Sequence, residues 1–162
     1  MLIEVRDFTR PTTPHKRKAS LSVVIREIVA LFSPVMQEKR IECRLRLDPR
    51  LPDFLFDPDQ VRQVLLNLIK NAVEAMPTGG FLSLRTFQAD DQGLVEIADT
   101  GEGIEPENLA QLFRPFYTTK KKGTGLGLAV AYKIVHDHNG DITVNSEPGR
   151  GTTITVQLPL AG

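Results

Sequence analysis

One amphipathic segment, residues 57–76, constrains the fold more than any other part of the chain. It starts with Asp57-Pro58, an N-cap followed by a residue suited to the first helical position. It stops before Pro77-Thr78-Gly79-Gly80, which cannot continue a helix. Its apolar residues recur at helical spacing on one face, and they are Val61, Val64, Leu65, Leu68, Ile69 and Ala72. A helix of this kind must bury that face against other elements, so the chain needs a layered core.

Three further helices are expected. Residues 21–32 have apolar side chains at helical spacing, and Ser20 or Ser22 can cap that helix. Residues 126–138 form another periodic segment, and a short helix is expected near 106–112. The two long helices join the helix at 57–76 in the predicted helical layer.

The remaining pattern predicts strands. Alternating apolar and polar residues occupy 41–47, 81–88, 93–98, 141–146 and 152–158. Turn residues at 90–93 and at 147–151 join the last four of these into two hairpins. Strands mixed with long helices in this order indicate an α+β domain, with a mixed, mostly antiparallel sheet and helices on one face.

Composition narrows the classes of function. The chain has 162 residues, enough for one domain with a real core. Its 20 basic and 20 acidic residues balance, so no overall charge draws it to nucleic acid, and no such partner is expected. It has no run of 18 apolar residues and no signal-peptide pattern. The single cysteine, Cys43, excludes an internal disulfide, and its alternating surroundings favour a core-facing side chain over a reactive thiol.

Two asparagines interrupt the solvent side of the helix at 57–76. Asn67 and Asn71 are four residues apart, and asparagine is a poor helix former. A solvated helix face explains them on spacing alone. The alternative is that both point into a pocket at the edge of the core, where an amide oxygen can ligate a Mg²⁺ ion held mainly by phosphates and water.

A glycine-bearing turn follows the strand at 93–98. It has the sequence Asp99-Thr100-Gly101-Glu102-Gly103-Ile104. An aspartate at a strand end can accept a hydrogen bond from an exocyclic amine, and the glycines let the backbone pack closely against a flat ligand. A simple turn is the alternative explanation.

A second glycine-rich turn opens the helix at 126–138. It reads Lys122-Gly123-Thr124-Gly125-Leu126-Gly127-Leu128 and follows Lys120-Lys121. A helix N-terminus preceded by glycines offers free N–H groups to phosphate. No strand precedes it, so it is not a dinucleotide fingerprint. The lysines fit a solvated charge run, and one of them could reach a terminal phosphate.

Taken together and in order, these motifs resemble the N, G1, F and G2 boxes of histidine protein kinases. The boxes are the Asn-bearing helix, Asp99-x-Gly101-x-Gly103, Leu112-Phe113-Arg114-Pro115-Phe116 and Gly123-Thr124-Gly125-Leu126-Gly127-Leu128. The end of the chain, from Gly149 to Thr153, is similar to theirs as well. The resemblance implies the Bergerat-type ATP-binding sandwich of the GHKL superfamily, with three helices on one face and a mobile ATP lid.

The resemblance also implies roles by position. Asn71 would bind Mg²⁺, Asp99 would accept from the adenine amino group, and Thr152 would support that site through water unless it is a plain strand hydroxyl. Phe113 and Phe116 would anchor or release the lid, with core packing as the alternative. The residues expected to bind ATP are Asn71, Asp99, Gly101, Gly103, Ile104, Phe113, Lys122, Gly123, Thr124, Gly125, Leu126, Gly127, Leu128 and Thr152.

The catalytic residues expected from the resemblance are Asn67, Asn71 and Lys120. Hydrolysing members of the superfamily have a glutamate where this chain has Asn67, and an amide cannot act as a general base near neutral pH. Asn67 therefore favours phosphoryl transfer to protein over ATP hydrolysis. Glu74 stands where some of these kinases have a basic residue, and the stretch from Asn71 to Gly80 is most similar to the nitrogen-regulation type.

The histidine that would receive the phosphoryl group is not expected within this chain. His15 lies in a basic stretch between Pro14 and the first helix, and His136 and His138 lie at a helix end where they can cap carbonyls. We expect residues 1–19 to be the end of a dimerisation element and a linker, and residues 20–162 to be the catalytic ATP-binding domain.

The implied partners are the dimerisation and histidine phosphotransfer domain of a longer parent protein and a downstream response regulator. The expected fragment is a cytoplasmic monomer, whether or not the parent is anchored to a membrane. The alternative is a nucleotide-binding regulatory module or serine kinase similar to anti-sigma factors, and a plain ATPase ranks last.

Overall fold

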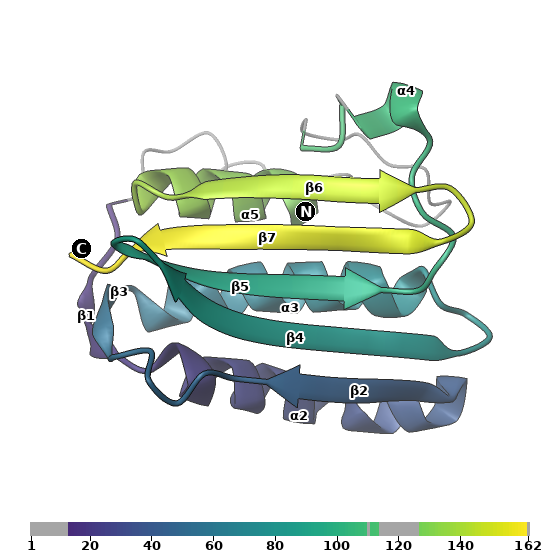
Figure 1. The fold of residues 1–162 in the computed structure, drawn as a ribbon, viewed down its shortest axis with the longest axis horizontal. Coiled ribbons are helices and arrows are strands. Elements are labelled where there is room, and N and C mark those ends of the chain that lie inside the picture. Colours follow the sequence, from purple (N-terminus) through teal and green to yellow (C-terminus); the bar gives the residue numbers. More distant parts are fainter. Residues whose placement is uncertain (1–12, 110, 114–126, 162) are drawn as a thin grey trace.

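The computed structural model describes residues 13–109, 111–113 and 127–161, which form a layer of helices over one face of a sheet (Figure 1). The helices are α2 (Leu21–Lys39), α3 (Pro58–Glu74), α4 (Pro106–Leu109) and α5 (Gly127–Asp137). The strands are β1 (Arg17–Ala19), β2 (Ile41–Arg46), β3 (Phe54–Phe56), β4 (Gly80–Ala89), β5 (Gln92–Asp99), β6 (Asp141–Glu147) and β7 (Gly151–Pro159). The predicted α+β class is confirmed.

Five strands form the main sheet in the order β2-β4-β5-β7-β6. Among the described strands, only β2 and β4 pair in parallel, and the connection between them contains α3. The three other pairs are antiparallel, and β4–β5 and β6–β7 are the two predicted hairpins. A parallel pair needs a long crossover whereas a hairpin needs only a turn, so α3 is brought onto the sheet by this one connection.

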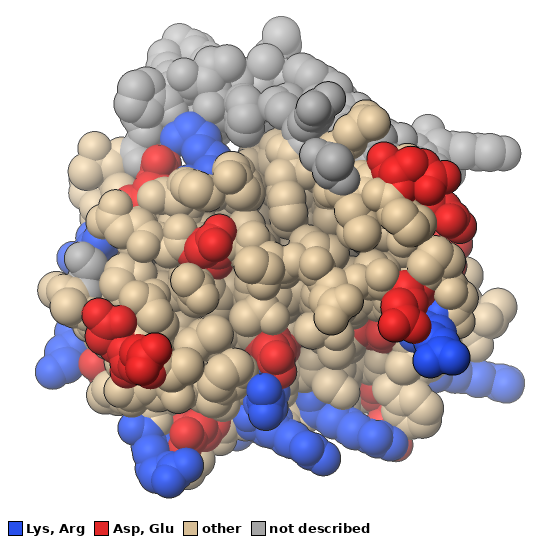
Figure 2. Space-filling model, turned by 45° about the horizontal axis from the view of Figure 1, so that its top comes forward, with Lys and Arg blue, Asp and Glu red and all other residues tan. Residues whose placement is uncertain are grey.

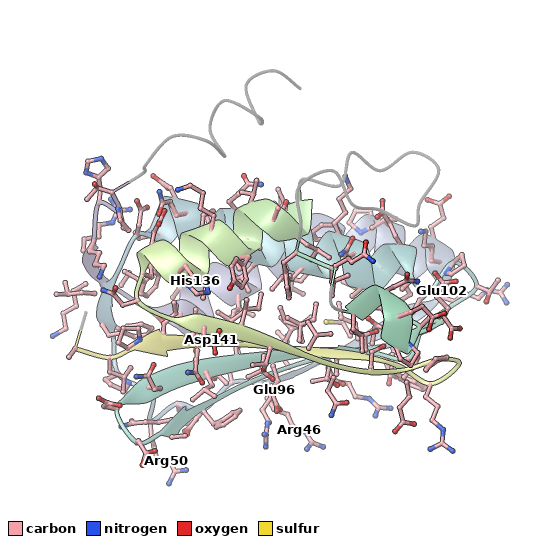
Figure 3. The ribbon with its side chains drawn as sticks, turned by 90° about the horizontal axis from the view of Figure 1, so that it is seen from above. Arg46, Arg50, Glu96, Glu102, His136 and Asp141 are labelled. Atoms are coloured by element: carbon pink, nitrogen blue, oxygen red, sulfur yellow. The ribbon has the colours of Figure 1, made fainter. Side chains whose placement is uncertain are left out.

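The three long helices lie on the same face of this sheet, with α3 between α2 and α5 (Figures 1 and 3). Arg46, Arg50 and Glu96 project from the opposite, open face in Figure 3. The core lies between the two layers. Its most deeply buried aliphatic side chains include Ile25, Leu65, Leu68, Ile69, Leu82 and Leu84.

Helix α2 begins at the predicted cap and continues past its proline. The Ser20 Oγ accepts a hydrogen bond from the Val23 N–H at 3.3 Å. Pro34 lies inside the helix on its exposed side, where the carbonyl that loses its partner can bond water. The helix persists because Met36, one turn from its end, is buried against the core.

A small second sheet lies outside the sequence prediction. Strand β1 pairs antiparallel with β3, with Arg17 opposite Phe56. Three-residue strands are too short to show alternation, so residues 17–19 were expected to be linker and residues 54–56 had no predicted element. Phe54 and Phe56 are both buried and their ring centroids lie 4.9 Å apart. The aromatic pair therefore closes the core at this end.

The N-terminus of α3 is held by the predicted cap. The Asp57 Oδ1 accepts hydrogen bonds from the N–H groups of Asp59 and Gln60, at 3.0 and 3.2 Å. Its Oδ2 accepts from the His15 N–H at 2.9 Å. One carboxylate therefore ties the start of the central helix to the chain segment that leads into β1.

The capping residue Asp57 also forms a hydrogen bond through its backbone N–H, to His138, which is 2% exposed. The His138 Nε2 accepts from the Asp57 N–H at 3.0 Å, while its Nδ1 lies 2.9 Å from the Ile134 carbonyl oxygen. The Asp57 N–H can only donate and the carbonyl can only accept, so His138 must carry its proton on Nδ1 and keep Nε2 bare. The prediction that a histidine caps carbonyls at this helix end is confirmed for His138.

Stability should fall as the solution becomes acidic. Burial is the largest cause that lowers the pKa of His138 below its usual 6.5, and the charge of Lys16 acts in the same direction. Below about pH 6.5 the unfolded chain therefore binds a proton that the folded chain resists, so the free energy of unfolding decreases as pH falls. Urea unfolding between pH 7.5 and 5.5 measures this slope.

The matched variants for this test are His138→Gln and His136→Gln. Glutamine can both accept and donate but does not titrate, so His138→Gln should flatten the pH dependence. His136 is exposed in the last turn of α5, two residues before His138, so His136→Gln should leave the slope of the wild type. Equal slopes in wild type and His138→Gln would contradict the assignment.

Candidate functional site

The polar edge of α3 has two kinds of side chain. Gln63, Lys70 and Glu74 are exposed, whereas Asn67 and Asn71 are half-buried at the border of the apolar face. The asparagines therefore lie nearer to the core than the charged residues around them. This arrangement supports the pocket-edge interpretation of the pair over a uniformly solvated face.

The side chain of Asn67 connects α3 to the first residue of α5. Its Nδ2 donates to the Gly127 carbonyl oxygen at 2.9 Å, and its Oδ1 accepts from the Gln63 Nε2 at 3.0 Å. Both ends of the amide are thus used within the protein. The structure therefore brings the asparagine-bearing helix and the last glycine of the second glycine-rich turn together.

Asp99 is the last residue of β5, where the strand gives way to the glycine-bearing loop. Its Oδ1 accepts from the Gly101 N–H at 2.9 Å, which turns the chain immediately after the strand. Across the sheet, Asp99 is paired with Leu82 of β4 and with Thr152 of β7. Asp99 lies on the same side of the sheet as the helices, next to the buried Ile97 two residues earlier.

The loop after Asp99 docks on the C-terminal end of α3. The Glu102 N–H donates to the Ala75 carbonyl oxygen at 3.3 Å. The Thr100 Oγ1 accepts from the Phe81 N–H at 3.0 Å and lies 3.7 Å from the buried Met76 sulfur. Asn71 precedes Ala75 by about one turn, so the loop and the asparagine share one end of the helix.

Two glycines make this docking possible. A Cβ on Gly101 would collide with the Ala75 carbonyl, and one on Gly103 would collide with the Glu147 carbonyl. Gly103 also has a φ of 75°, in the left-handed region that favours glycine. These two contacts confine the loop between α3 and the β6–β7 hairpin, and Figure 3 shows Glu102 at that end of the molecule.

The hairpin β6–β7 holds the other side of the loop. The Ile104 N–H donates to the Ser146 Oγ at 2.8 Å, and the Gly149 N–H donates to the Glu102 carbonyl at 2.7 Å. Ser146 Oγ also lies 2.8 Å from Thr152 Oγ1, and Thr152 is 9% exposed. Ser146 was not among the predicted site residues. A serine in place of an apolar residue at the inward end of β6 was the available signal.

Phe113 packs on α5. Its ring lies 5.4 Å from that of Tyr132, at an interplanar angle of 26°. Phe113 and Leu128 are both partly buried against the main core. Packing, one of the two explanations offered for Phe113, is therefore observed, and its role toward a lid stays a prediction.

Several predicted site residues lie outside the described part of the chain. They are Phe116, Lys120, Lys122, Gly123, Thr124, Gly125 and Leu126. The expected lid, its phosphate contacts and the lysine role thus stay predictions. The residues that the structure does bring together are Asn67 with Gly127, and Asp99 and Thr152 with the loop from Gly101 to Ile104.

The charges of the described surface are mixed. Figure 2, in which the top of Figure 1 is turned toward the viewer, shows both acidic and basic side chains, with the basic ones mostly along the lower edge of the view. In the ranges that the structure describes, no three His, Cys, Asp or Glu side chains gather as a metal cluster, and no helix is long and apolar enough to cross a membrane. A metal ion bound among the described residues would therefore need ligands other than a cluster of His, Cys, Asp or Glu side chains.

Comparison with known proteins agrees with this geometry. Residues 56–162 match the family described as histidine kinase-, DNA gyrase B-, and HSP90-like ATPase. The sensor histidine kinase ZraS of Escherichia coli strain K12 is 36% identical over 97% of this chain. Sporulation kinase E of Bacillus subtilis strain 168 is 34% identical over 99% of it. The chain spans 34% and 22% of the lengths of these two relatives.

Solved structures give the same result. The catalytic domain of the histidine kinase ThkA matches with a TM-score of 0.83 and 29% identity, over 91% of this chain and 99% of that one. Full-length ShkA in complex with AMPPNP matches with a TM-score of 0.89 and 28% identity, over 99% of this chain and 34% of that one. These matches agree with the aspartate-glycine loop that docks on the asparagine-bearing helix. The chain belongs to the family of histidine kinase-, DNA gyrase B- and HSP90-like ATPases, and it is the ATP-binding catalytic domain of a sensor histidine kinase.

Proposed function

We propose that this domain binds ATP with Mg²⁺ and transfers the γ-phosphoryl group to a histidine on a separate dimerisation and phosphotransfer domain. One observation carries the proposal: Asp99 ends β5 beside Thr152, and its loop is pinned to the end of the helix that carries Asn71. This arrangement supports a site at one end of α3, where Asp99 would accept from a base and Asn71 would ligate a metal.

The described residues fit a nucleotide. The Asp99 Oδ1 accepts from the Gly101 N–H, and a carboxylate has several lone pairs, so Asp99 would also accept from an amino group of a base. The loop backbone at Gly101 and Gly103 is fixed by close packing, so its shape is set before a ligand arrives. Preorganisation of this kind lowers the entropy cost of binding.

Asn71 fits a magnesium ion that is held mostly by phosphates. It is half-buried, and the described residues place no acidic cluster that would hold the ion alone. Mg²⁺ keeps several waters and takes one or two protein oxygens in nucleotide sites. The ion would neutralise charge that develops on the transferred group.

Asn67 supports transfer to protein rather than to water. Its amide is engaged with Gly127 and Gln63, and an amide cannot take a proton from water near neutral pH. A histidine of the acceptor domain would supply its own lone pair and needs no such base. Asn67 would act by holding the start of α5 at the site.

The proposed partners are the parent's dimerisation and histidine phosphotransfer domain and a response regulator. ThkA, whose fold this chain shares, has been solved in complex with the response regulator protein TrrA. We further propose that the isolated domain is a cytoplasmic monomer without a nucleic-acid partner.

The adenine contact is tested by Asp99→Asn. The variant keeps an oxygen for the Gly101 N–H but loses the charged acceptor, so ATP affinity should fall about ten- to hundredfold while the fold survives. Asp141→Asn is the control, because the exposed Asp141 also accepts a backbone N–H, from Ile142. Calorimetry on both variants measures the change, and unchanged affinity in Asp99→Asn would refute the assignment.

The metal contact is tested by Asn71→Ala, with Lys70→Ala on the adjacent exposed position as control. Asn71→Ala should weaken ATP binding in the presence of Mg²⁺ by about tenfold or more, because one ligand of the ion is lost. With the metal removed by EDTA, wild type and variant should bind ATP alike. A loss of equal size with and without Mg²⁺ would show that Asn71 acts on the fold or on ATP itself.

Phosphoryl transfer is tested with labelled ATP, Mg²⁺ and a dimerisation domain from a related sensor kinase. Label should appear on the histidine of the added domain, and Asn71→Ala should prevent it. Label on serine of a small partner would favour the kinase similar to anti-sigma factors. Steady phosphate release without a labelled protein would favour a plain ATPase.

A further inference from the structure

Three polar residues stand side by side across the strands next to the docked loop. Asp99 of β5 is paired with Thr152 of β7, which is paired with Ser146 of β6. All three occupy the helix-facing side of the sheet, in line with the inward residues Ile97 and Ile154. The row therefore forms one wall of the proposed nucleotide site, and its outer member is Ser146.

Ser146 has three polar neighbours within hydrogen-bond distance. Its Oγ receives the Ile104 N–H at 2.8 Å, lies 3.0 Å from the Gly151 carbonyl oxygen and lies 2.8 Å from Thr152 Oγ1. A hydroxyl has one proton to donate and two lone pairs to accept with. Three partners thus use the whole capacity of the group.

The proton count selects one arrangement. If Ser146 donates to the Gly151 carbonyl, it can accept from both Ile104 and the Thr152 hydroxyl, and all three contacts are hydrogen bonds. If Ser146 donates to Thr152 instead, its oxygen and the Gly151 carbonyl oxygen stand 3.0 Å apart without a proton between them. The first arrangement satisfies every group, as partly buried polar atoms generally require.

In that arrangement the Thr152 hydroxyl has already donated its proton to Ser146. Thr152 then offers only lone pairs on its remaining side, as the Asp99 carboxylate does. Two neighbouring acceptors suit a base that presents an amino group, directly or through water. They disfavour a base that presents a keto oxygen at the same place, because that oxygen would face two other acceptors with no proton between them.

We propose that Ser146 is a positioning residue that sets base specificity, by holding the proton of Thr152 away from the site and by fixing the Ile104 end of the loop. The inference rests on the proposed function, since it concerns the base of the nucleotide bound there. It adds that the choice of adenine over guanine depends on a side chain that does not touch the base.

The test compares the affinities for ATP and GTP by calorimetry in wild type, Ser146→Ala, Ser146→Thr and Ser83→Ala. Ser146→Ala frees the Thr152 hydroxyl to donate toward a keto oxygen and leaves the Ile104 N–H without its acceptor. Its ATP affinity should fall about tenfold while GTP affinity falls less, so the ATP-to-GTP ratio drops. Ser146→Thr keeps the hydroxyl and should keep the ratio.

Ser83 is a matched control because it also lies in a strand of the main sheet, paired with Ala98 on the face away from the helices. A purely structural role of Ser146 would lower the melting temperature and both affinities together, with the ratio unchanged, and would overturn the proposal. A ratio that falls equally in Ser83→Ala would overturn it as well. Should Ser146→Ala fail to fold, Ser146→Cys keeps the volume with a weaker hydrogen-bonding group, and its ratio must still fall.

The wild-type affinities separate the proposed role of Ser146 from the proposed nucleotide-binding function. Wild type that binds neither nucleotide would refute the proposed function and this inference with it. Wild type that prefers ATP, together with a Ser146→Ala variant that keeps the same preference, would refute the role of Ser146 alone.

Discussion

Burial of α3 between two other helices and the sheet is the constraint on which the rest of the structure depends. The helix is fixed at both ends by groups far away in sequence. The Asp57 N–H is bonded to His138 at its start, and the Ala75 carbonyl receives the Glu102 N–H at its end. The apolar face makes the core while the polar edge carries Asn67 and Asn71. One helix thereby sets both the packing and the place of the site.

The helix-facing side of the main sheet changes from apolar to polar along one row of paired residues. One row across it runs from Cys43 through Leu82 to Asp99, Thr152 and Ser146. The first two side chains pack with the core, and burial raises the pKa of the Cys43 thiol, in keeping with an unreactive position. The last three are polar and meet the glycine loop. The candidate site lies where the core ends along this row, so a ligand there would contact both apolar side chains and fixed hydrogen-bonding groups.

Much of this organisation could be predicted from the sequence because its signals are local. The α3 cap, the Ser20 cap and the two hairpins depend on residues within a few positions of one another, and all are confirmed. The β1–β3 pair was missed because its three-residue strands are too short to show alternation and because it joins segments about 37 residues apart. Ser146 was missed for a related reason: its importance comes from the proximity of Ile104, and spacing along the chain does not reveal that contact.

The hydrogen bond between Asp57 and His138 has a consequence for how the chain acquires its structure. It joins residues 81 positions apart, and the His15 contact reaches the same cap from 42 positions on the other side. The start of the central helix is therefore completed only when segments from both directions have arrived. Contacts of such long range slow folding, because chain entropy is lost before they form. A piece of the domain that stops before α5 would leave the Asp57–His138 bond unmade, so we expect such a piece to be less stable than the whole domain.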